Sequence, residues 1–287
     1  MVSARIAVIG GSGLYEMPGL MNVEEVVATT PFGSPSDSLF VGELGGISIA
    51  FLPRHGRGHR LNPTEVPSKA NIYALKAIGV QQIISISAVG SLQEQIHPLD
   101  MVVPDQLIDR THSRPSTFFE NGVVAHISFA EPFCPVMRSL LVEELNKTES
   151  AVHDGGTYVV IEGPSFSTMA ESKIYRSWEA SIIGMTALPE AKLAREAEIC
   201  YTTLACVTDY DVWHETHGAV TVEMVLANLQ TNVAVAQKLI RQIVTRLPMD
   251  RNCECARALR NAVITSPDDM TASAKDYFQL IAGDLVN

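Results

Sequence analysis

The stretch Ile199-Cys-Tyr-Thr-Thr-Leu-Ala-Cys-Val207, followed at once by Thr208-Asp209-Tyr210-Asp211, decides the fold. Its first part is rich in β-branched, aromatic and other apolar residues and follows a helical-looking segment opened by Pro189, which predicts a buried strand. In an open α/β sheet, ligands bind beyond the carboxyl ends of the strands. Asp209 and Asp211 are therefore expected at the mouth of a site, on the same side if the backbone stays extended.

Two carboxyl groups held this close should differ in pKa. Such a difference suits one group for donating a proton and the other for accepting a hydrogen bond. The alternative is a solvated loop with two surface acids, and an Asp-x-Asp pair alone does not decide between the two interpretations. The remaining motifs of the chain favour the functional one.

Further strands and helices are predicted on both sides of this stretch. The expected strands cover residues 5–9, 39–44, 47–52, 82–87, 157–161 and 181–185, and the expected helices cover 66–78, 168–178, 189–198 and 221–246. Their order predicts one α/β domain over residues 1–248, with a mixed central sheet flanked by helices on both faces. Pro248 marks a break, and residues 249–287 are expected to form a helical extension packed on the same domain.

The composition excludes several classes of protein. The 287 residues carry a net charge of −11, which argues against nucleic acid or an anionic membrane as the partner. No apolar run approaches the roughly 18 residues that a membrane helix needs, and the N-terminal apolar stretch is too short for a signal peptide, so we expect a cytoplasmic protein. Only 18% of the residues are charged, which hints at buried contacts between subunits.

The five cysteines fit a cytoplasmic protein. Cys134, Cys200 and Cys206 stand singly and are expected to line the core or a pocket. Cys253 and Cys255 form a Cys-x-Cys pair, either a strained disulfide or a redox pair. The absence of a second Cys-x-Cys or of a nearby histidine pair argues against a zinc site.

Two segments favour binding of an anion. Gly10-Gly-Ser-Gly13 follows the first strand and predicts a turn whose backbone N–H groups, with the Ser12 hydroxyl, cradle an anion. It is not a dinucleotide fingerprint, because Glu16 stands where the third glycine should be. Arg54-His-Gly-Arg-Gly-His-Arg60 concentrates positive charge in an acidic chain, which also favours an anionic ligand. A solvated basic loop is the main alternative, and the interleaved glycines oppose the helix that a His-x-x-x-His metal pair would need.

Two further segments have weaker signals. Ser87-Ala-Val-Gly-Ser91 ends a predicted strand in small residues, where a backbone N–H can meet a phosphate. Gly163-Pro-Ser-Phe-Ser167 lacks the last glycine of a serine-hydrolase elbow, so a hydrolytic triad is not expected. Ser167 or Thr168 is instead expected to cap the helix that carries Glu171.

In this order along the chain, the motifs resemble the trimeric purine nucleoside phosphorylase family, most closely its branch that acts on 5'-methylthioadenosine. The resemblance covers about residues 5 to 245 and also includes linking segments. Its main motifs are Gly10–Gly13, Arg54–His59, Ser87–Ser91, Ile161–Phe166, Met185–Glu190 and Thr208–Asp211, and its linking segments are Thr30–Asp37, Ile108–Pro115 and Ala130–Pro135.

The resemblance implies a role for each matching position. Asp209 and Asp211 would read the purine and carry the catalysis, and relatives that take 6-oxopurines have asparagine where Asp209 stands. Met185 would lie beneath the ribose and Phe166 against the base. The residues expected to hold phosphate are Ser12, Arg54, His55, Ser87, Ala88 and Thr186; those expected to set specificity around the 5' methylthio group are Ser167, Val222 and Val225; and His126 is expected to come from a neighbouring subunit.

The implied activity is phosphorolysis of 5'-methylthioadenosine to adenine and 5-methylthioribose 1-phosphate by a homotrimer. Inorganic phosphate would be the co-substrate, with no metal and no organic cofactor. The alternatives are a 6-oxopurine or methylthioinosine phosphorylase, a nucleosidase that uses water, and a nucleoside-binding module without turnover.

The chain departs from the family pattern in places. Ser12 and Ser87 stand where relatives often carry threonine, and His97-Pro-Leu-Asp100 replaces a Pro-Gly-Asp turn. The tail beyond Pro248 resembles the family least, so it does not reveal which residue closes the 5' pocket. Its Cys253-x-Cys255 pair is similar to one found in some thermophilic relatives.

Overall fold

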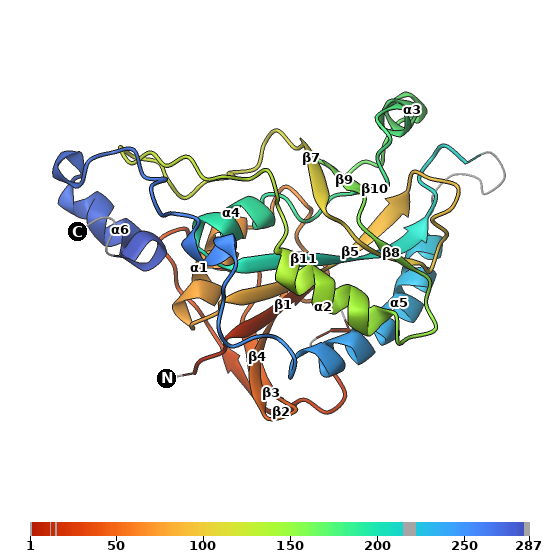
Figure 1. The fold of residues 1–287 in the computed structure, drawn as a ribbon, viewed down its shortest axis with the longest axis horizontal. Helices are drawn as coiled ribbons and strands as arrows, with labels where there is room; N and C mark the ends of the chain where they lie inside the picture. Colours follow the sequence, from red (N-terminus) through yellow and green to blue (C-terminus); the bar gives the residue numbers. More distant parts are fainter. Residues whose placement is uncertain (1, 12, 15, 215–221, 284–287) are drawn as a thin grey trace.

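The chain folds into a branched sheet with helices on both faces (Figure 1), as the sequence predicts. This computed structural model describes residues 2–11, 13–14, 16–214 and 222–283. The strands are β1 (Ile6–Gly10), β2 (Met21–Val26), β3 (Leu39–Leu44), β4 (Ile47–Pro53), β5 (Gln82–Ser91), β6 (Met101–Val103), β7 (Gln106–Arg110), β8 (Val152–Asp154), β9 (Thr157–Ile161), β10 (Ile182–Gly184) and β11 (Cys200–Asp209). The helices are α1 (Ser68–Ala77), α2 (Pro135–Leu145), α3 (Met169–Ser177), α4 (Glu190–Glu196), α5 (Val222–Ile243) and α6 (Ala272–Ala282), with short 3-10 turns η1 (Glu254–Arg257) and η2 (Pro267–Asp269).

β5 lies at the centre of the sheet and pairs with three strands. Along its length it is parallel to β1 and β11, and its last residues pair with β10 in the antiparallel sense. β4 is parallel to β1 on the other side. The carboxyl ends of β4, β1, β5 and β11 therefore meet at one edge of the sheet, which is the edge where ligands bind in this type of fold.

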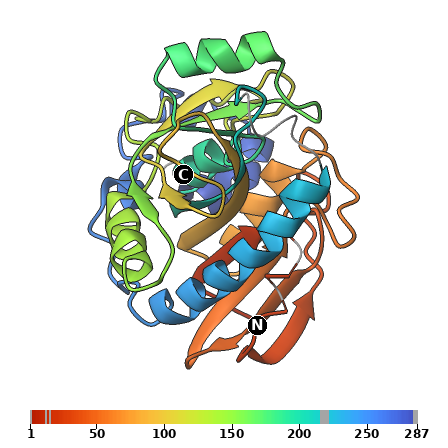
Figure 2. The ribbon, with the colours of Figure 1, turned by 90° about the vertical axis from the view of Figure 1, so that its right-hand side faces the viewer.

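The core has two halves because the central strands are buried on both faces. Successive residues of β1 alternate between the halves, with Ala7 and Ile9 in one and Ile6 and Val8 in the other. The first half includes α1, α4 and α6, and the second includes α2 and α5. Figure 2 shows α5 crossing the sheet obliquely.

The predicted strands and helices are present, with shifted ends. β5 continues to Ser91 and β11 to Asp209, because the two strands pair with each other to the end, with Asp209 opposite Gly90. Ser87–Ser91 and Asp209 thus belong to strands rather than to loops. The prediction missed β2, β6, β7, β8 and α2; β6 and β8 have only three residues each, and nearly all of β2 is exposed without apolar alternation.

Most of the chain after Pro248 packs against the first half of the core, whereas Cys255 belongs to the second half. Phe278 of α6 is fully buried and stacks on Phe119 with ring centroids 5.4 Å apart. By contrast, α3 stands at the periphery in both views (Figures 1 and 2). Within the described residues, none of the helices is long and apolar enough to cross a membrane.

Candidate active site

Asp209, the last residue of β11, and Asp211, just beyond it, are buried, 6% and 5% exposed, so they are not acids of a solvated loop. The backbone between them is not extended, contrary to the condition set by the sequence argument. A β-bulge at Thr208 places one extra residue opposite β5, and Asp211 has a positive φ of 51°. The Asp211 N–H donates to Asp209 Oδ1 over 2.8 Å, which fixes the two carboxylates relative to one another.

Gly90 allows this arrangement. A Cβ added to Gly90 would lie 2.7 Å from Asp209 Oδ1, so any larger residue at this position would displace the carboxylate. The sequence signal for this close approach was the glycine within Ser87–Ser91. Its function is to admit the Asp209 side chain.

Burial raises the pKa of both aspartates, while hydrogen bonds from the Thr208 hydroxyl and the Asp211 N–H oppose this for Asp209. Both Asp209 oxygens have partners, since Oδ2 accepts from Thr208 Oγ1 over 2.7 Å. Asp211 Oδ2 is buried without a hydrogen-bond partner among the described residues. A buried acceptor without a donor is costly, and the Ser172 hydroxyl lies close enough to lower the pKa of Asp211, so Ser172 is the donor beside this carboxylate.

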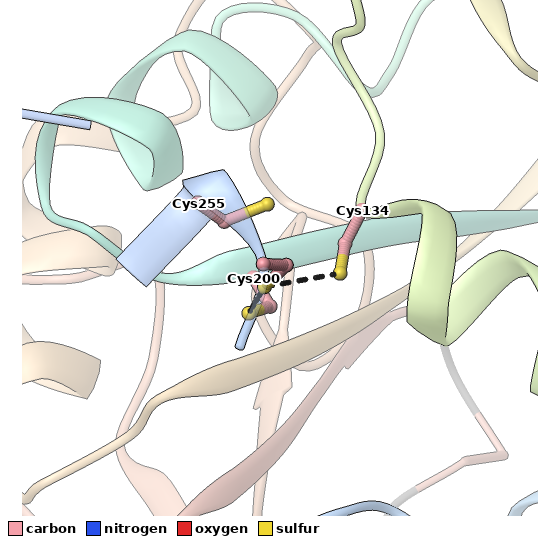
Figure 3. Close-up of side chains that lie close together, drawn as sticks. Cys134, Cys200 and Cys255 are labelled. Carbon is pink, nitrogen blue, oxygen red and sulfur yellow. Dashed lines mark hydrogen bonds between the residues drawn. The ribbon is translucent and has the colours of Figure 1, made fainter. Parts of the chain in front are cut away.

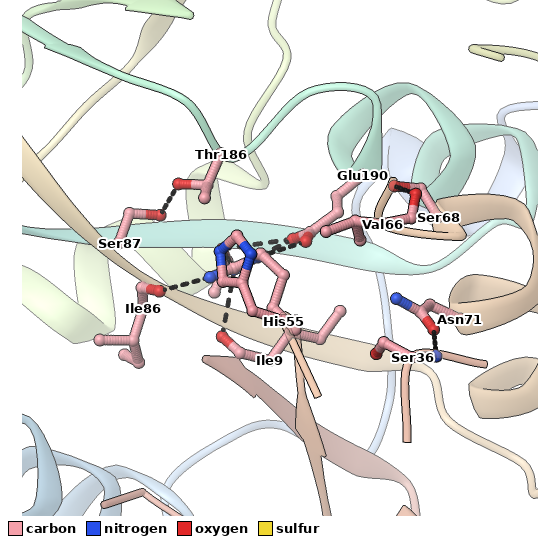
Figure 4. A network of polar contacts seen from close by, with 12 residues as sticks. Ile9, Ser36, His55, Val66, Ser68, Asn71, Ile86, Ser87, Thr186 and Glu190 are labelled. Carbon is pink, nitrogen blue, oxygen red and sulfur yellow. Dashed lines mark hydrogen bonds and ion pairs between the residues drawn. The ribbon is translucent and has the colours of Figure 1, made fainter. Parts of the chain in front are cut away.

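Arg54 follows β4 and is buried at the same edge of the sheet, 3% exposed. Its Nε donates to Glu190 Oε1 over 2.5 Å, and its Nη2 donates to Ser85 Oγ over 2.7 Å. Nη1 donates to the Ile86 carbonyl over 2.9 Å (Figure 4). The second Nη1 hydrogen has no acceptor in the described part of the chain, so this one donor remains for an anion.

The other arginines of the basic segment already have acidic partners. Arg57 pairs with Asp37 over 2.9 Å and with Glu25 over 2.8 Å, and Arg60 lies 3.7 Å from Asp37. The expectation that the local excess of positive charge requires an anionic ligand therefore fails for Arg57 and Arg60. Arg54, through the Nη1 hydrogen that its pairing with Glu190 leaves unused, and His55 remain candidates from this segment.

His55 is held as a neutral imidazole. Burial, the charge of Arg54 and the neighbouring His59 lower the pKa of His55 to about 4. Nδ1 lies 2.9 Å from the Leu61 carbonyl, and because a carbonyl only accepts, Nδ1 carries the proton. His55 Nε2 is therefore an acceptor and suits the O–H of a monoprotonated phosphate.

A chain of hydroxyl groups connects Tyr158 of β9, Thr186, two residues beyond β10, and Ser87 of β5. Thr186 Oγ1 donates to Ser87 Oγ over 2.8 Å, as Figure 4 shows, and Tyr158 lies 3.1 Å from Thr186 Oγ1. The Thr186 hydrogen is used for Ser87, so Tyr158 is the donor to Thr186. The Ser87 hydrogen has no acceptor among the described groups and is free to donate to a ligand.

Two glycines, Gly184 and Gly163, allow other residues to pack closely beside this chain of hydroxyl groups. A Cβ on Gly184 would lie 2.6 Å from the Tyr158 hydroxyl and 3.3 Å from the Ala88 carbonyl, so Ala88 and the hydroxyl chain are adjacent. Gly163 approaches Met185 similarly, with the Met185 sulfur 2.5 Å from an added Cβ. Met185 thus packs under the Gly163 loop, next to Thr186.

The residues that follow the Gly163 loop have different environments: one caps a helix, one is buried and one is exposed. Thr168, not Ser167, caps α3, and it forms a capping box with Glu171. Ser167 Oγ is buried with no hydrogen-bond partner in the described regions. Phe166 is 47% exposed, so a ligand would have to cover it.

α5 is attached to the end of β11 by two asparagines that the sequence analysis did not select. Asn228 Nδ2 donates to the Thr208 carbonyl over 2.7 Å, and Asn232 Nδ2 to the Val207 carbonyl over 3.0 Å. These carbonyls lie at the bulge, where the strand pairing is interrupted. Val225, half-buried, lies one turn before Asn228 on the same helix.

Some predicted residues are not brought together. Ser12 and the side chain of Val222 lie outside the described residues, although the Val222 backbone opens α5. His126 is exposed, and its N–H donates to the Ala262 carbonyl in the C-terminal tail over 2.9 Å. In this chain His126 therefore belongs to a surface segment.

Glu190 is a central residue that the sequence analysis quoted without giving it a role. It is 2% exposed and accepts from Arg54, from Ser85 and, over 2.9 Å, from the Tyr201 hydroxyl. Its one sequence signal was an acid directly after Pro189, at the start of a predicted helix. Its partner Arg54 is 136 residues away in sequence, so the pairing is visible only in the fold.

This edge of the sheet therefore combines two different chemistries. One part holds hydroxyl, imidazole and guanidinium groups suited to a protonated oxyanion, and the other holds two buried carboxylates with one acceptor unused. Such a pair of subsites suits transfer of a group between a nitrogen base and an anion.

The class of protein agrees with this chemistry: the chain matches the Phosphorylase superfamily over residues 5–245 and belongs to that family. Among curated relatives, the S-methyl-5'-thioadenosine phosphorylase of Chloroflexus aurantiacus is 57% identical over 284 residues, which are 99% of each chain. The protein of the same name from Thermosynechococcus vestitus is 55% identical over 98% of each chain.

Solved structures of methylthioadenosine phosphorylases are also similar to this chain. A methylthioadenosine phosphorylase from an antarctic soil metagenomic library has a TM-score of 0.94 at 50% identity, covering 98% of this chain and 99% of that one. The methylthioadenosine phosphorylase of Schistosoma mansoni in complex with adenine has a TM-score of 0.84 at 35% identity, covering 90% of this chain and 96% of that one.

Proposed function

We propose that this protein is an S-methyl-5'-thioadenosine phosphorylase, which converts methylthioadenosine and phosphate to adenine and 5-methylthioribose 1-phosphate. The observation that carries the proposal is the buried pair Asp209 and Asp211, next to a strand whose Ser87 begins a set of anion-binding groups. Near-full-length relatives at 55% and 57% identity with that name support it. The reaction serves purine and methionine salvage.

Asp209 and Asp211 act at the base. Cleavage of the N-glycosidic bond leaves negative charge on the purine, so a proton donor near N7 assists departure, by roughly 10²- to 10⁴-fold. Burial raises the pKa of both carboxyl groups, which favours such a donor. Asp209 serves N7 and accepts from the 6-amino group, and the unused Asp211 Oδ2 supports it at that same amino group.

The phosphate groups act at the sugar. Phosphate, held by Arg54, His55, Ser87, Thr186, the Ala88 backbone and Ser12, stabilises the positive charge that develops on the ribose and then attacks C1'. Met185 supports the ribose and Phe166 covers the base. Because phosphate is itself the nucleophile, the reaction needs no metal and no organic cofactor at the reacting atoms.

The deciding experiment measures adenine release at increasing phosphate concentration. We expect saturation with phosphate, and Ser87→Ala should raise the phosphate KM about 10- to 100-fold, the effect of one hydrogen bond to a charged group. Ser139→Ala, on the exposed face of α2, is the matched control and should change nothing. Full turnover in phosphate-free buffer would identify a nucleosidase, and binding without turnover would identify a binding module.

The 5' end of the substrate gives a second prediction. Val222, Val225 and Ser167 form the wall around the methylthio group, so adenosine should be poorer than methylthioadenosine by about 10- to 200-fold in kcat/KM, the effect of one apolar group. Val225→Gln should reduce that difference, whereas Thr231→Gln, exposed on the same helix, should preserve it. Equal kcat/KM values for the two nucleosides would show that the pocket lies elsewhere.

We further propose that the enzyme is a cytoplasmic homotrimer whose sites include His126 from a neighbour. Apolar side chains in and near α3 are exposed, including Met169, Ile174 and Trp178, each 47–48% exposed. Light scattering should give about three times the 31.1 kDa chain mass. A fully active monomer would refute this assembly and remove His126 from the site.

A further inference from the structure

Four of the five cysteines form one cluster far from the active site. The sulfurs of Cys134, Cys200, Cys253 and Cys255 all lie within 4.8 Å of one another. Figure 3 shows the side chains of Cys134, Cys200 and Cys255 converging. Cys134, Cys200 and Cys255 are buried, at 1%, 1% and 2% exposure, and Cys253 is half-buried.

A zinc site was not expected from the sequence, because Cys253-x-Cys255 has no second Cys-x-Cys beside it and Cys134 and Cys200 stand singly. The fold supplies these two cysteines as the missing ligands. The fold brings Cys200, which begins β11, and Cys134, which precedes α2, to the 3-10 turn that carries the pair. The sequence therefore contained all four ligands but gave no indication of their proximity.

We propose that these four cysteines bind one zinc ion as a tetrahedral thiolate site. A Zn–S distance of about 2.3 Å in a tetrahedron requires sulfurs about 3.8 Å apart. The Cys134 and Cys253 sulfurs are 3.8 Å apart, and the Cys200 and Cys253 sulfurs are 3.3 Å apart. A closed set of four sulfurs is the ligand set of a structural zinc site, and binding needs only loss of the thiol protons to solvent.

The surroundings supply an entry path. A pocket of about 20 Å³, enough for one water, reaches the cluster. Cys134, Cys200 and Cys253 line it. A metal ion can therefore approach the sulfurs without unfolding of the protein.

The position of the cluster makes the zinc structural rather than catalytic. Cys200 and Asp209 stand at opposite ends of β11, nine residues apart, which corresponds to about 30 Å along a strand. What the cluster joins is the C-terminal tail, through Cys253 and Cys255, to the sheet and to α2. The zinc would thus fasten residues 249–283 to the domain.

The test uses the full-length, tag-free protein isolated with a phosphine reductant. We expect about one zinc per chain by elemental analysis. The zinc-free protein, loaded with Co²⁺ alone, should show the visible absorption of tetrahedral cobalt and a sulfur-to-cobalt charge-transfer band. Chelation should lower the unfolding temperature and accelerate amide exchange in residues 249–283 more than elsewhere.

Matched cysteine variants separate this site from other thiol chemistry. Cys253→Ser, at the least buried position, should lose the zinc and the cobalt bands. Cys206→Ser removes the cysteine of β11 that lies outside the cluster and should retain both. The absence of bound zinc or cobalt in folded wild type would overturn the proposal, whether its thiols are free or paired in disulfides.

Discussion

The Asp209→Asn variant should lose most of its activity on methylthioadenosine and gain measurable activity on methylthioinosine. We expect kcat/KM for methylthioadenosine to fall by roughly 10²- to 10⁴-fold, because the amide cannot supply the proton that adenine departure needs. The wild type should not accept methylthioinosine, since a buried carboxylate facing a 6-oxo group can cost as much as 10⁴- to 10⁵-fold.

The structure indicates that this substitution is tolerated. The asparagine oxygen can keep the bond from the Asp211 N–H, and one amide hydrogen can bond Thr208 Oγ1. The Thr208 hydroxyl already lies 3.2 Å from the Val89 carbonyl and can donate there instead. The second amide hydrogen is then free for a 6-oxo oxygen, so the new activity follows from the existing hydrogen bonds.

The control is Asp211→Asn, which should lose activity without gaining the new substrate. The measurement is kcat/KM for both nucleosides on the wild type and the two variants. A wild type that prefers methylthioinosine would support the 6-oxopurine alternative. An Asp209→Asn variant that is unchanged on methylthioadenosine would remove Asp209 from the reaction.

Glu190→Ala should have the largest effect on stability. It leaves the Arg54 guanidinium buried without its counter-charge, and breaking a buried ion pair in this way costs about 3–5 kcal/mol. The free energy of unfolding, measured by urea denaturation, should fall by about this amount. Activity should fall as well, because Arg54 would no longer be oriented toward phosphate.

A double variant separates these two effects. Arg54→Met with Glu190→Met replaces the pair by apolar side chains and should recover much of the stability, because well-packed apolar residues can replace a buried ion pair. Phosphate KM or kcat should remain impaired, since the donor is absent. If the double variant retains normal phosphate kinetics, Arg54 is not a phosphate ligand. If Glu190→Ala alone has the same urea midpoint of unfolding as the wild type, the Arg54–Glu190 ion pair does not stabilise the fold.

Local pattern was enough to predict the central strands and the edge where the site forms. β1, β5 and β11 are long apolar segments with turn residues at their ends, and parallel pairing brings those ends together. α2 was missed although Pro135 marks its first turn. β6 and β8 were missed because three residues are too few to show a period.

The details of the site depend on pairings that a single sequence does not reveal. The bulge at Thr208 arises from the register of β11 against β5 and has no local signature. Arg54 meets Glu190, and Cys134 meets Cys253, only after the sheet has formed. The basic loop illustrates the reverse: Arg57 and Arg60 looked like anion ligands until the fold supplied Asp37 as their partner.

The attachment of α5 to the bulge has a consequence for specificity. Asn228 and Asn232 bind the carbonyls on either side of the point where the Asp209 strand end is redirected, and the same helix carries Val225. If Val225 and Asp209 have the roles proposed for them, a substitution that tilts α5 should change the wall of the 5' pocket and the position of the base-reading acids together. On the proposed function, preference for the 5' group and preference for the purine are mechanically linked through α5, so a change in one should be accompanied by a change in the other.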